Sequence, residues 1–314
     1  VNSLELFKTQ KFYQIDISIL KDLGYDVLLS NRIFDSLLFW KYDILFSYFY
    51  RYSFFAALLA KCFGKKTYFT GGIDSLDSDY ASAFNYKIQA LFFKLCYWVA
   101  DSCIIVSQSD LKNIFKVSSL KKKLSYSEHV INTKLFIADV PKEKIFTSIV
   151  WMGDEGNVVR KGVDKALQIF AELKKIPEFV DYRFVIIGRK GEGEVLVRSI
   201  IDKYNLKGSV ELKGEVSEED KINLLKQSKY YFQLSLYEGF GLAALEALCA
   251  NNIIIHSGKG GLANPIYKEQ LLFDIDNDFD SELLKLVNKL ACFTPITSYD
   301  NLLEYYDIQR RKDD

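Results

Sequence analysis

Short apolar runs alternate with longer segments of helical periodicity between residues 147 and 291. The short runs contain many β-branched and aromatic residues, as buried strands do. The longer segments place apolar residues three and four positions apart, as amphipathic helices do. We predict strands at 147–152, 183–187, 209–213, 230–236, 253–256 and 271–275, and helices at 163–175, 194–204, 218–227, 242–250 and 281–291. This order is typical of a parallel sheet with helices on both faces.

The first 138 residues alternate in the same way but are richer in aromatic side chains. A first helix ends at Gly24, and further helices are predicted at 53–63, 83–100 and 110–116. The predicted strands are 25–29, 42–49, 66–70, 102–106 and, more weakly, 123–130. A polar break at 136–144 separates the two series. We therefore divide the chain into a domain of residues 1–138, a domain of residues 139–291 and a tail of residues 292–314.

The stretch from Tyr230 to Ala250 combines a predicted strand, a glycine-bearing turn and a helix. The turn has the sequence EGFG and begins at Glu238. The free N–H groups and the dipole at a helix N-terminus favour anionic ligands. Two glycines allow the backbone to come close to whatever is bound. We therefore expect a ligand at this turn.

A second glutamate, Glu246, lies on the core-facing side of the same predicted helix. It shares an apolar stripe with Leu242, Leu245 and Cys249. A buried carboxylate is costly unless it is hydrogen-bonded or paired, so Glu246 should have a partner. The structural alternative is a solvated Glu238 and a salt-bridged Glu246 without a ligand.

A glycine-bearing loop at residues 153–162 is the second candidate site. It follows a predicted strand and ends with Arg160, Lys161 and Gly162 at the start of a predicted helix. Guanidinium and ammonium groups at such a place are suited to phosphate oxygens. Alternatively both are solvated charges. Cations gain nothing from the dipole at a helix start, and this placement favours a ligand.

These motifs resemble a known family. EGFGLAALE, in which seven residues separate Glu238 from Glu246, is similar to the E-x7-E signature of the retaining glycosyltransferases of family 4, the group 1 transferases. Lys161 and Gly162 match the end of the family's G-R-x-x-x-x-K-G motif, and Asp154 stands at its arginine position. KDLGYDV, ADSCIIVSQS and VINTKLF resemble segments of the family's acceptor-binding half. The resemblance implies an α/β fold of GT-B type, with two Rossmann-like domains whose parallel sheets face a central cleft.

The resemblance also implies roles for individual residues. Glu238, Lys161 and Arg160 would be catalytic, with the cations on the diphosphate and Glu238 on the sugar hydroxyls. Arg160 is assigned to the role of the missing arginine, and Glu246 would contact the ribose hydroxyls. The other expected contacts to the nucleotide sugar lie in glycine-bearing loops: Gly153, Gly188, Gly214, Val216, Gly239, Phe240, Gly241 and Leu242. C-terminal tails in this family often cross back to the first domain.

The expected activity is a retaining, metal-independent transfer of a hexosyl group to a hydroxyl acceptor. The donor would be a UDP-, GDP- or ADP-sugar, and no separate cofactor is expected. The acceptor would be a glycan, a lipid-linked molecule or a protein, in the assembly of a polysaccharide, glycolipid or glycoprotein.

Composition limits the partners and the compartment. The formal net charge is zero, which argues against nucleic acid as a partner. The five cysteines occur singly, as buried thiols in a reducing compartment do. The two histidines lack metal-ligand spacing, so we expect no metal site. The most apolar stretches are interrupted by charges and predict no membrane span, which favours a cytoplasmic protein.

The aromatic residues between Phe34 and Trp98 have two interpretations. They form a bulky core, which is the commoner case. Alternatively, part of them lies with the lysines at 112, 116 and 121–123 against a membrane that bears a lipid-linked acceptor. Peripheral membrane contact is thus one of the predicted interactions.

Two departures from the family pattern leave a second function open. The family's first strand and glycine-rich loop have no clear counterpart before the first helix, and Gly71 stands where the family often has a histidine. The alternative is a non-catalytic GT-B subunit that binds nucleotide and partners an active transferase. The E-x7-E signature argues against a sugar-nucleotide epimerase. The lack of a G-x-G-x-x-G sequence after any strand argues against a dehydrogenase.

Overall fold

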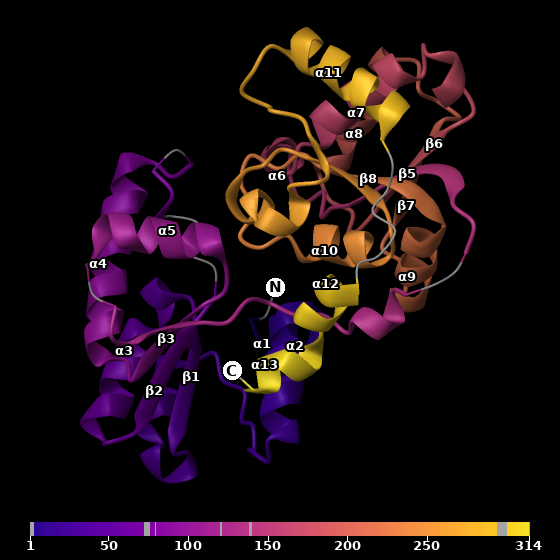
Figure 1. Cartoon of the computed structure of the whole chain (residues 1–314). Helices are drawn as coiled ribbons and strands as arrows, with labels where there is room; N and C mark the ends of the chain where they lie inside the picture. The colour runs from indigo at the N-terminus through magenta and orange to yellow at the C-terminus, as the bar shows by residue number, and fades with distance from the viewer. Residues whose placement is uncertain are drawn as a thin grey trace. The chain divides into compact units, whose positions relative to one another are not determined.

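The computed structural model describes residues 3–71, 76–78, 80–119, 121–137, 140–293 and 300–313. The chain folds into two compact units (Figure 1). Unit 1 contains Val1–Ile131 and Tyr306–Asp314, and unit 2 contains Asn132–Tyr305. The boundary that we placed from the sequence, between residues 138 and 139, lies outside the described residues. Each unit has a parallel sheet with helices packed on it, which confirms the α/β fold class.

Unit 2 is built on a six-stranded parallel sheet in the order β10-β9-β8-β5-β6-β7. The strands are β5 (Glu143–Ile149), β6 (Arg183–Ile187), β7 (Val210–Gly214), β8 (Ser228–Gln233), β9 (Ile253–His256) and β10 (Leu271–Leu272). The helices are α6 (Glu155–Arg160), α7 (Val163–Leu173), α8 (Glu194–Lys203), α9 (Glu218–Gln227), α10 (Leu242–Cys249), α11 (Phe279–Cys292) and α12 (Asp300–Tyr305). The strand order reverses between the neighbours β5 and β8. Ligands of open α/β sheets bind beyond the carboxyl ends of strands at such a point.

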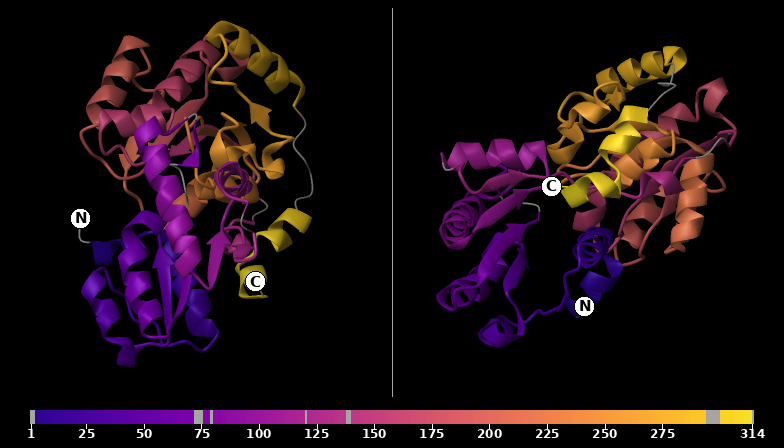
Figure 2. Two further views of the ribbon diagram at one scale, coloured as in Figure 1. Left: turned by 90° about the vertical axis from the view of Figure 1, so that its left-hand side faces the viewer. Right: turned by 60° about the horizontal axis from the view of Figure 1, so that its bottom comes forward.

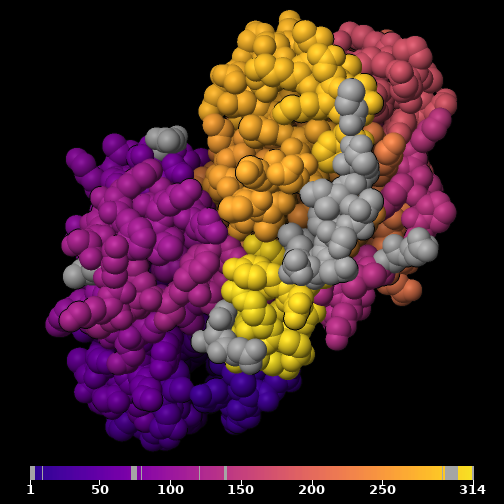
Figure 3. Space-filling model, in the orientation of Figure 1, coloured from indigo at the N-terminus to yellow at the C-terminus, as the bar shows by residue number. Residues whose placement is uncertain are grey.

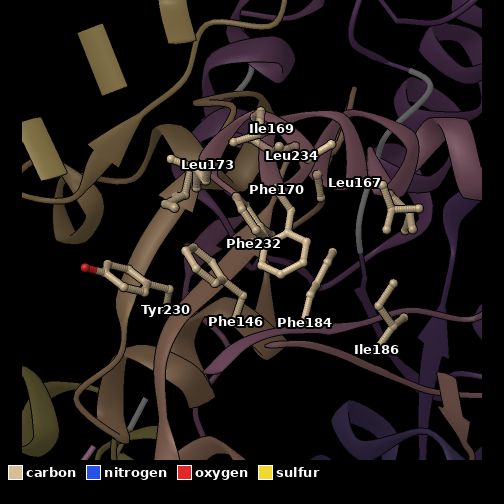
Figure 4. Packing of buried hydrophobic residues seen from close by; sticks show 14 of the residues in the cluster. Phe146, Leu167, Ile169, Phe170, Leu173, Phe184, Ile186, Tyr230, Phe232 and Leu234 are labelled. Carbon is tan, nitrogen blue, oxygen red and sulfur yellow. The ribbon is translucent and has the colours of Figure 1, made fainter. Parts of the chain in front are cut away.

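Aromatic side chains join the centre of this sheet to α7. Phe146 of β5 stacks on Phe232 of β8, with ring centroids 5.1 Å apart, and Phe170 of α7 meets the edge of Phe146 at 5.5 Å (Figure 4). All three rings are buried, and each buried side chain of this size contributes about 1.5–3 kcal/mol. This packing holds β5 and β8 rigidly side by side, and with them the loops at their carboxyl ends.

Unit 1 has a four-stranded parallel sheet in the order β1-β2-β3-β4. The strands are β1 (Ile44–Tyr48), β2 (Lys66–Thr70), β3 (Ser102–Ile105) and β4 (Leu124–Tyr126). The connecting helices are α3 (Tyr50–Cys62), α4 (Ala83–Val99) and α5 (Gln108–Val117), and all three contribute to one core cluster with β2 and β3. Two N-terminal helices, α1 (Ser3–Thr9) and α2 (Lys11–Asp22), place Phe7 and Tyr13 against the Tyr48 ring of β1.

The predicted strand at residues 25–29 is wrong. These residues have no regular secondary structure, and the first strand of the chain is β1. Leu28 is 65% exposed and Tyr25 is 50% exposed, so the apolar run covers no core. The pattern resembled a strand, but no neighbouring strand pairs with it in the sheet.

The end of the chain belongs to unit 1. Helix α13 (Ile308–Asp313) lies beside α2 (Figure 2). Arg311 is buried, pairs with Asp16 of α2 at 3.1 Å, and donates to the carbonyl oxygens of Ser127 and Glu128. The hydroxyl of Tyr48 donates to the other oxygen of Asp16 at 2.9 Å. A buried ion pair needs such additional hydrogen bonds to offset its desolvation.

Candidate functional site

Lys161 and Glu238 form an ion pair at the switch point of the unit 2 sheet. The Lys161 Nζ lies 2.7 Å from Glu238 Oε2, and the two side chains are 21% and 16% exposed. Lys161 follows α6 after strand β5, whereas Glu238 lies beyond the end of β8. The structure therefore brings together two residues that are 77 positions apart in the sequence.

Polar side chains of the β8 strand and its extension fix the position of Glu238. Gln233 Nε2 and Ser235 Oγ each donate to Glu238 Oε2 at 3.2 Å, and the Tyr231 hydroxyl donates to Gln233 Oε1 at 3.1 Å. Burial raises the pKa of Tyr231, which keeps its hydroxyl protonated as a donor. The donors Lys161, Gln233 and Ser235 all reach the same oxygen of Glu238, Oε2. No described residue donates to Oε1, so that oxygen can accept a further hydrogen bond.

The sequence suggested a continuous loop at residues 153–162, but the structure has a helix within it. Glu155–Arg160 form the helix α6, and the Asp154 side chain caps it by accepting from the Asn157 N–H at 2.6 Å. Asp154, which replaces the family's arginine, thus has a structural role. Arg160 and Lys161 lie at the end of α6, where cations are favoured, and not simply at the start of α7.

Arg160 does not reach Glu238. Its guanidinium donates to Asn157 Oδ1 at 2.6 Å, and its backbone oxygen accepts from the Leu236 N–H at 2.8 Å. The backbone of Arg160 therefore joins the two loops, while Lys161 supplies the cation beside Glu238.

Two glycines allow the segments that follow α6 and β9 to come close to the segment that follows β8. Gly162 has φ +68°, and a Cβ there would lie 2.0 Å from the Leu234 carbonyl oxygen. Gly260 has φ +57°, and its Cβ would lie 2.2 Å from the Glu238 carbonyl oxygen. The same oxygen accepts from the Gly261 N–H at 2.6 Å. The loop of residues 259–264, which follows β9, thereby supports the backbone of Glu238.

Glu246 is buried in α10, and its partner is Lys221 of α9. The Lys221 Nζ lies 2.7 Å from Glu246 Oε2 and 3.0 Å from Glu218 Oε2. The prediction that Glu246 is buried and paired is confirmed. Lys221 also lies 6.0 Å from the centre of the Phe136 ring. Ribose binding by Glu246 stays a prediction.

The remaining predicted contacts lie at the carboxyl ends of neighbouring strands. The Gly188 N–H donates to the Gly214 carbonyl at 2.8 Å, so the loops after β6 and β7 meet. Val216 packs on the cluster formed by β5, β6 and α9. Gly153 lies beside the Trp151 ring, and Gly239, Phe240 and Gly241 lead directly into α10 at Leu242. The structure thus places these residues around the same end of the sheet.

Gly71 directly follows β2 in unit 1 and has φ +106°, a conformation that side chains rarely adopt. A Cβ there would also lie 3.4 Å from the Phe49 ring. A histidine at this position would therefore be strained. Asp74, which the sequence shares with the family, lies outside the described residues.

The structure also bears on metals and membranes. Among the described residues, no group of three or more histidine, cysteine, aspartate or glutamate side chains is arranged to hold a metal ion. Asp274 and Asp276, the first two aspartates of the D-I-D-N-D-F-D segment at residues 274–280, both lie within 4.0 Å of Lys259. No described helix is long and apolar enough to cross a membrane.

Sequence reasoning missed the support of both glutamates. Tyr231, Gln233 and Ser235 occur at every second position, and this period of two places them on one face of an extended chain. The occurrence of these polar residues on a strand that is otherwise apolar was the sequence signal from which the hydrogen-bonded network could have been predicted. Lys221 had no comparable signal, because it meets Glu246 only through the packing of α9 on α10.

Part of the chain matches a known family. Residues 156–290 match the family model of glycosyl transferases group 1. The chain is 32% identical over 163 residues to the GDP-mannose:cellobiosyl-diphosphopolyprenol alpha-mannosyltransferase of Xanthomonas oryzae, covering 45% of this chain and 40% of that protein. It is 30% identical over 105 residues to one of the subunits of human phosphatidylinositol N-acetylglucosaminyltransferase, covering 33% of this chain and 21% of that protein. The matched region thus spans less than half the length of either relative.

Solved structures extend the likeness to both units. HepE from Anabaena superposes with a TM-score of 0.70 at 12% identity, covering 95% of this chain and 86% of its own. TarM superposes with a TM-score of 0.63 at 17% identity, covering 86% of this chain and 50% of its own. The identity is low, so these likenesses establish the fold alone. Residues 156–290 are therefore similar to the group 1 glycosyl transferases, and the fold of the chain is GT-B.

Proposed function

We propose that the chain transfers a sugar from a nucleoside diphosphate-sugar to a hydroxyl acceptor with retention of configuration. The observation that carries the proposal is the Lys161–Glu238 pair beyond the ends of β5 and β8. Known proteins with this fold support a nucleotide-sugar donor. HepE was solved with UDP-glucose, and the trehalose-6-phosphate protein of E. coli with UDP-2-fluoro glucose. The Xanthomonas relative is named for GDP-mannose.

The ion pair suits the charge that develops during the transfer. Breaking the bond between the sugar and the diphosphate leaves negative charge on the phosphate oxygens. The Lys161 ammonium and the N–H groups at the start of α7 are preorganised cations and dipoles for that charge. Glu238 Oε1 would accept from a sugar hydroxyl, while Oε2 stays bonded to Lys161. Glu246 would accept from the ribose, with Lys221 holding its side chain in place.

The proposed transfer needs no metal ion, because Lys161 and helix N-termini supply the positive charge. Activity should therefore persist in excess EDTA. Complete loss on chelation, restored by magnesium or manganese, would contradict this part of the proposal. Arg160 would contribute a second cation only if its bond to Asn157 is exchanged for a phosphate.

The proposal is tested by a donor screen with the purified chain. Calorimetry and thermal shift with UDP, GDP and ADP, and then with their sugars, would identify the base. Each sugar nucleotide would then be incubated alone, and release of the nucleoside diphosphate measured by ion-exchange chromatography. We expect one base to bind and its sugar to be hydrolysed slowly. No binding of any of the three would contradict the proposal.

Gly71 favours the second candidate, a non-catalytic subunit that binds nucleotide and partners an active transferase. The left-handed backbone at Gly71 leaves no histidine at the end of β2. Human and Arabidopsis relatives are themselves named as subunits. This candidate predicts nucleotide binding without hydrolysis or transfer by the isolated chain.

For the transferase, the proposal includes a glycan, lipid-linked or protein acceptor and a cytoplasmic location.

A further inference from the structure

The helical layer of unit 1, formed by α3, α4 and α5, has almost no negative charge. Its one acidic residue is Asp110, which is fully buried. Its basic residues are Arg51, Lys61, Lys87, Lys94, Lys112 and Lys116, of which Lys61 pairs with Asp101 at 2.7 Å. Its atoms, purple to magenta, form an outer surface of unit 1 in the space-filling view (Figure 3). For a chain with zero net charge, this concentration of positive charge is a local property of one surface.

Helix α4 exposes an apolar stripe within this layer. Phe84 and Trp98 are each 71% exposed, and Leu91 is 55% exposed. They lie seven residues apart, and Lys87 and Lys94 occupy the same face between them. The opposite face of α4 already contributes Phe93 and Cys96 to the core. The exposed stripe is therefore additional to what the fold requires, because a helix that only covers a sheet needs one apolar face.

The neighbouring helices extend the same chemistry. Tyr52 and Phe55 of α3 are 77% and 55% exposed, and Phe115 of α5 is 44% exposed. The Lys121 Nζ lies 4.7 Å from the centre of the Phe115 ring. Lys123 Nζ donates to the carbonyl oxygen of Trp98 at 3.0 Å, which attaches the lysine run 121–123 to the end of the stripe. Within the described ranges, none of the lysines of α4 and α5 forms an ion pair.

We propose that this layer binds the surface of an anionic phospholipid membrane. Tryptophan, tyrosine and phenylalanine are suited to the boundary between headgroups and acyl chains, and each lysine near an anionic surface strengthens binding about fivefold, or about 1 kcal/mol. Interfaces between proteins are depleted in lysine, so the mixture of lysines and aromatic rings favours lipid over a protein partner. The layer binds with its helices parallel to the membrane. Binding requires no donor or acceptor, so it is independent of the proposed transfer.

Trp98 provides a direct test. The chain has three tryptophans, and Trp40→Phe with Trp151→Phe leaves Trp98 as the only one. Vesicles of phosphatidylcholine with phosphatidylglycerol should shift its emission to shorter wavelength, and lipids brominated near the headgroup should quench it. Vesicles of phosphatidylcholine alone should give neither effect. Binding to anionic vesicles with unchanged Trp98 emission would overturn the assignment of the surface, and equal binding to both vesicles would overturn the role of charge.

Matched variants distinguish membrane binding by the stripe from nonspecific hydrophobic binding. Lys87→Ala with Lys94→Ala should weaken cosedimentation with anionic vesicles about 25-fold. Leu91→Asp should nearly abolish it, whereas Leu284→Asp on α11, where the leucine is 64% exposed, should leave it unchanged. Melting temperatures confirm that each variant is folded. Equal effects of the two leucine substitutions would overturn the proposal. So would a dimer that forms without vesicles and is lost in Leu91→Asp, because the layer would then bind a second copy of this chain.

Discussion

At the scale of single residues, the proposed function makes the charge on Lys161 the main determinant of nucleotide binding. Lys161→Ala should weaken nucleoside diphosphate binding by about 1.5–3 kcal/mol, the value of a charge-assisted hydrogen bond. The substitution also leaves the Glu238 carboxylate beside the phosphates without its cation. Adding Glu238→Gln to Lys161→Ala should therefore restore part of the affinity. Calorimetry measures both variants.

Lys190 is the matched control for Lys161, because its side chain also lies at this end of the sheet, against Gly214. Lys190→Ala should change the affinity little. An equal loss for the two lysines, or no loss for Lys161→Ala, would show that the ion pair does not mark the phosphate site.

The two glutamates should respond differently to removal of their charge. Glu238→Gln should reduce turnover strongly and leave the affinity for free nucleoside diphosphate nearly unchanged, because Glu238 is expected on the sugar. Glu246→Gln should weaken the free nucleotide, because a charge-assisted bond to ribose is lost. Glu218, whose Oε2 lies 3.0 Å from the Lys221 Nζ, remains as a partner for Lys221 and limits the cost to folding. Equal losses of nucleotide affinity at unchanged melting temperature would refute this division of roles.

The buried histidine of β9 should make unit 2 sensitive to acid. Burial lowers the pKa of His256 to about 4, below its ordinary value of 6.5. Between these values the unfolded chain binds a proton that the folded chain does not, so stability falls as the pH falls through 6.5. From pH 7 to pH 5 the loss should be about 2 kcal/mol. Urea unfolding followed by Trp151 fluorescence should show a smaller loss in His256→Gln, and an unchanged loss would exclude His256 as its cause.

At the scale of elements, the approach of the α6–α7 connection to the end of β8 depends on Gly162. Alanine in a left-handed conformation costs about 1–2 kcal/mol, and overpacking against the Leu234 carbonyl adds about 1–3 kcal/mol. Gly208 has φ +83° but open space around a Cβ, so Gly208→Ala bears only the first cost. Chemical denaturation should therefore show a larger loss for Gly162→Ala. Equal losses would mean that the loop moves away without strain.

Elements with a strong pattern were predictable from the sequence, and short or unpaired ones were not. The bounds of β6, α9 and β9 agree with the predictions residue for residue. Helix α6 was missed because its single turn and a half contains Gly156 and presents no apolar period. The strand predicted at residues 25–29 was wrong because an apolar run becomes a strand only where a partner strand accepts its hydrogen bonds. For the site, the motif gave Lys161, Glu238 and Glu246, whereas Lys221 and Gln233 depended on tertiary packing.

At the scale of the whole molecule, the last helix completes unit 1 through Arg311. Arg311→Met leaves Asp16 buried without its cation and should destabilise unit 1 by about 3–5 kcal/mol. Lys312→Met on the same helix removes an ion pair with Asp22 that is 23% and 50% exposed, and should cost at most about 1 kcal/mol. Hydrogen exchange would locate the loss. Greater exchange in β5–β8 than in β1 and α2 would contradict this assignment.

The return of residues 306–314 to unit 1 has a consequence for synthesis on the ribosome. Unit 2 is continuous from Asn132 to Tyr305, and it can acquire its native contacts as soon as that segment has left the exit tunnel. Unit 1 is translated first, yet the ion pair of Asp16 with Arg311 can form only after Arg311 has been added, nearly three hundred codons later. During elongation the earlier unit therefore remains incomplete while the later one folds.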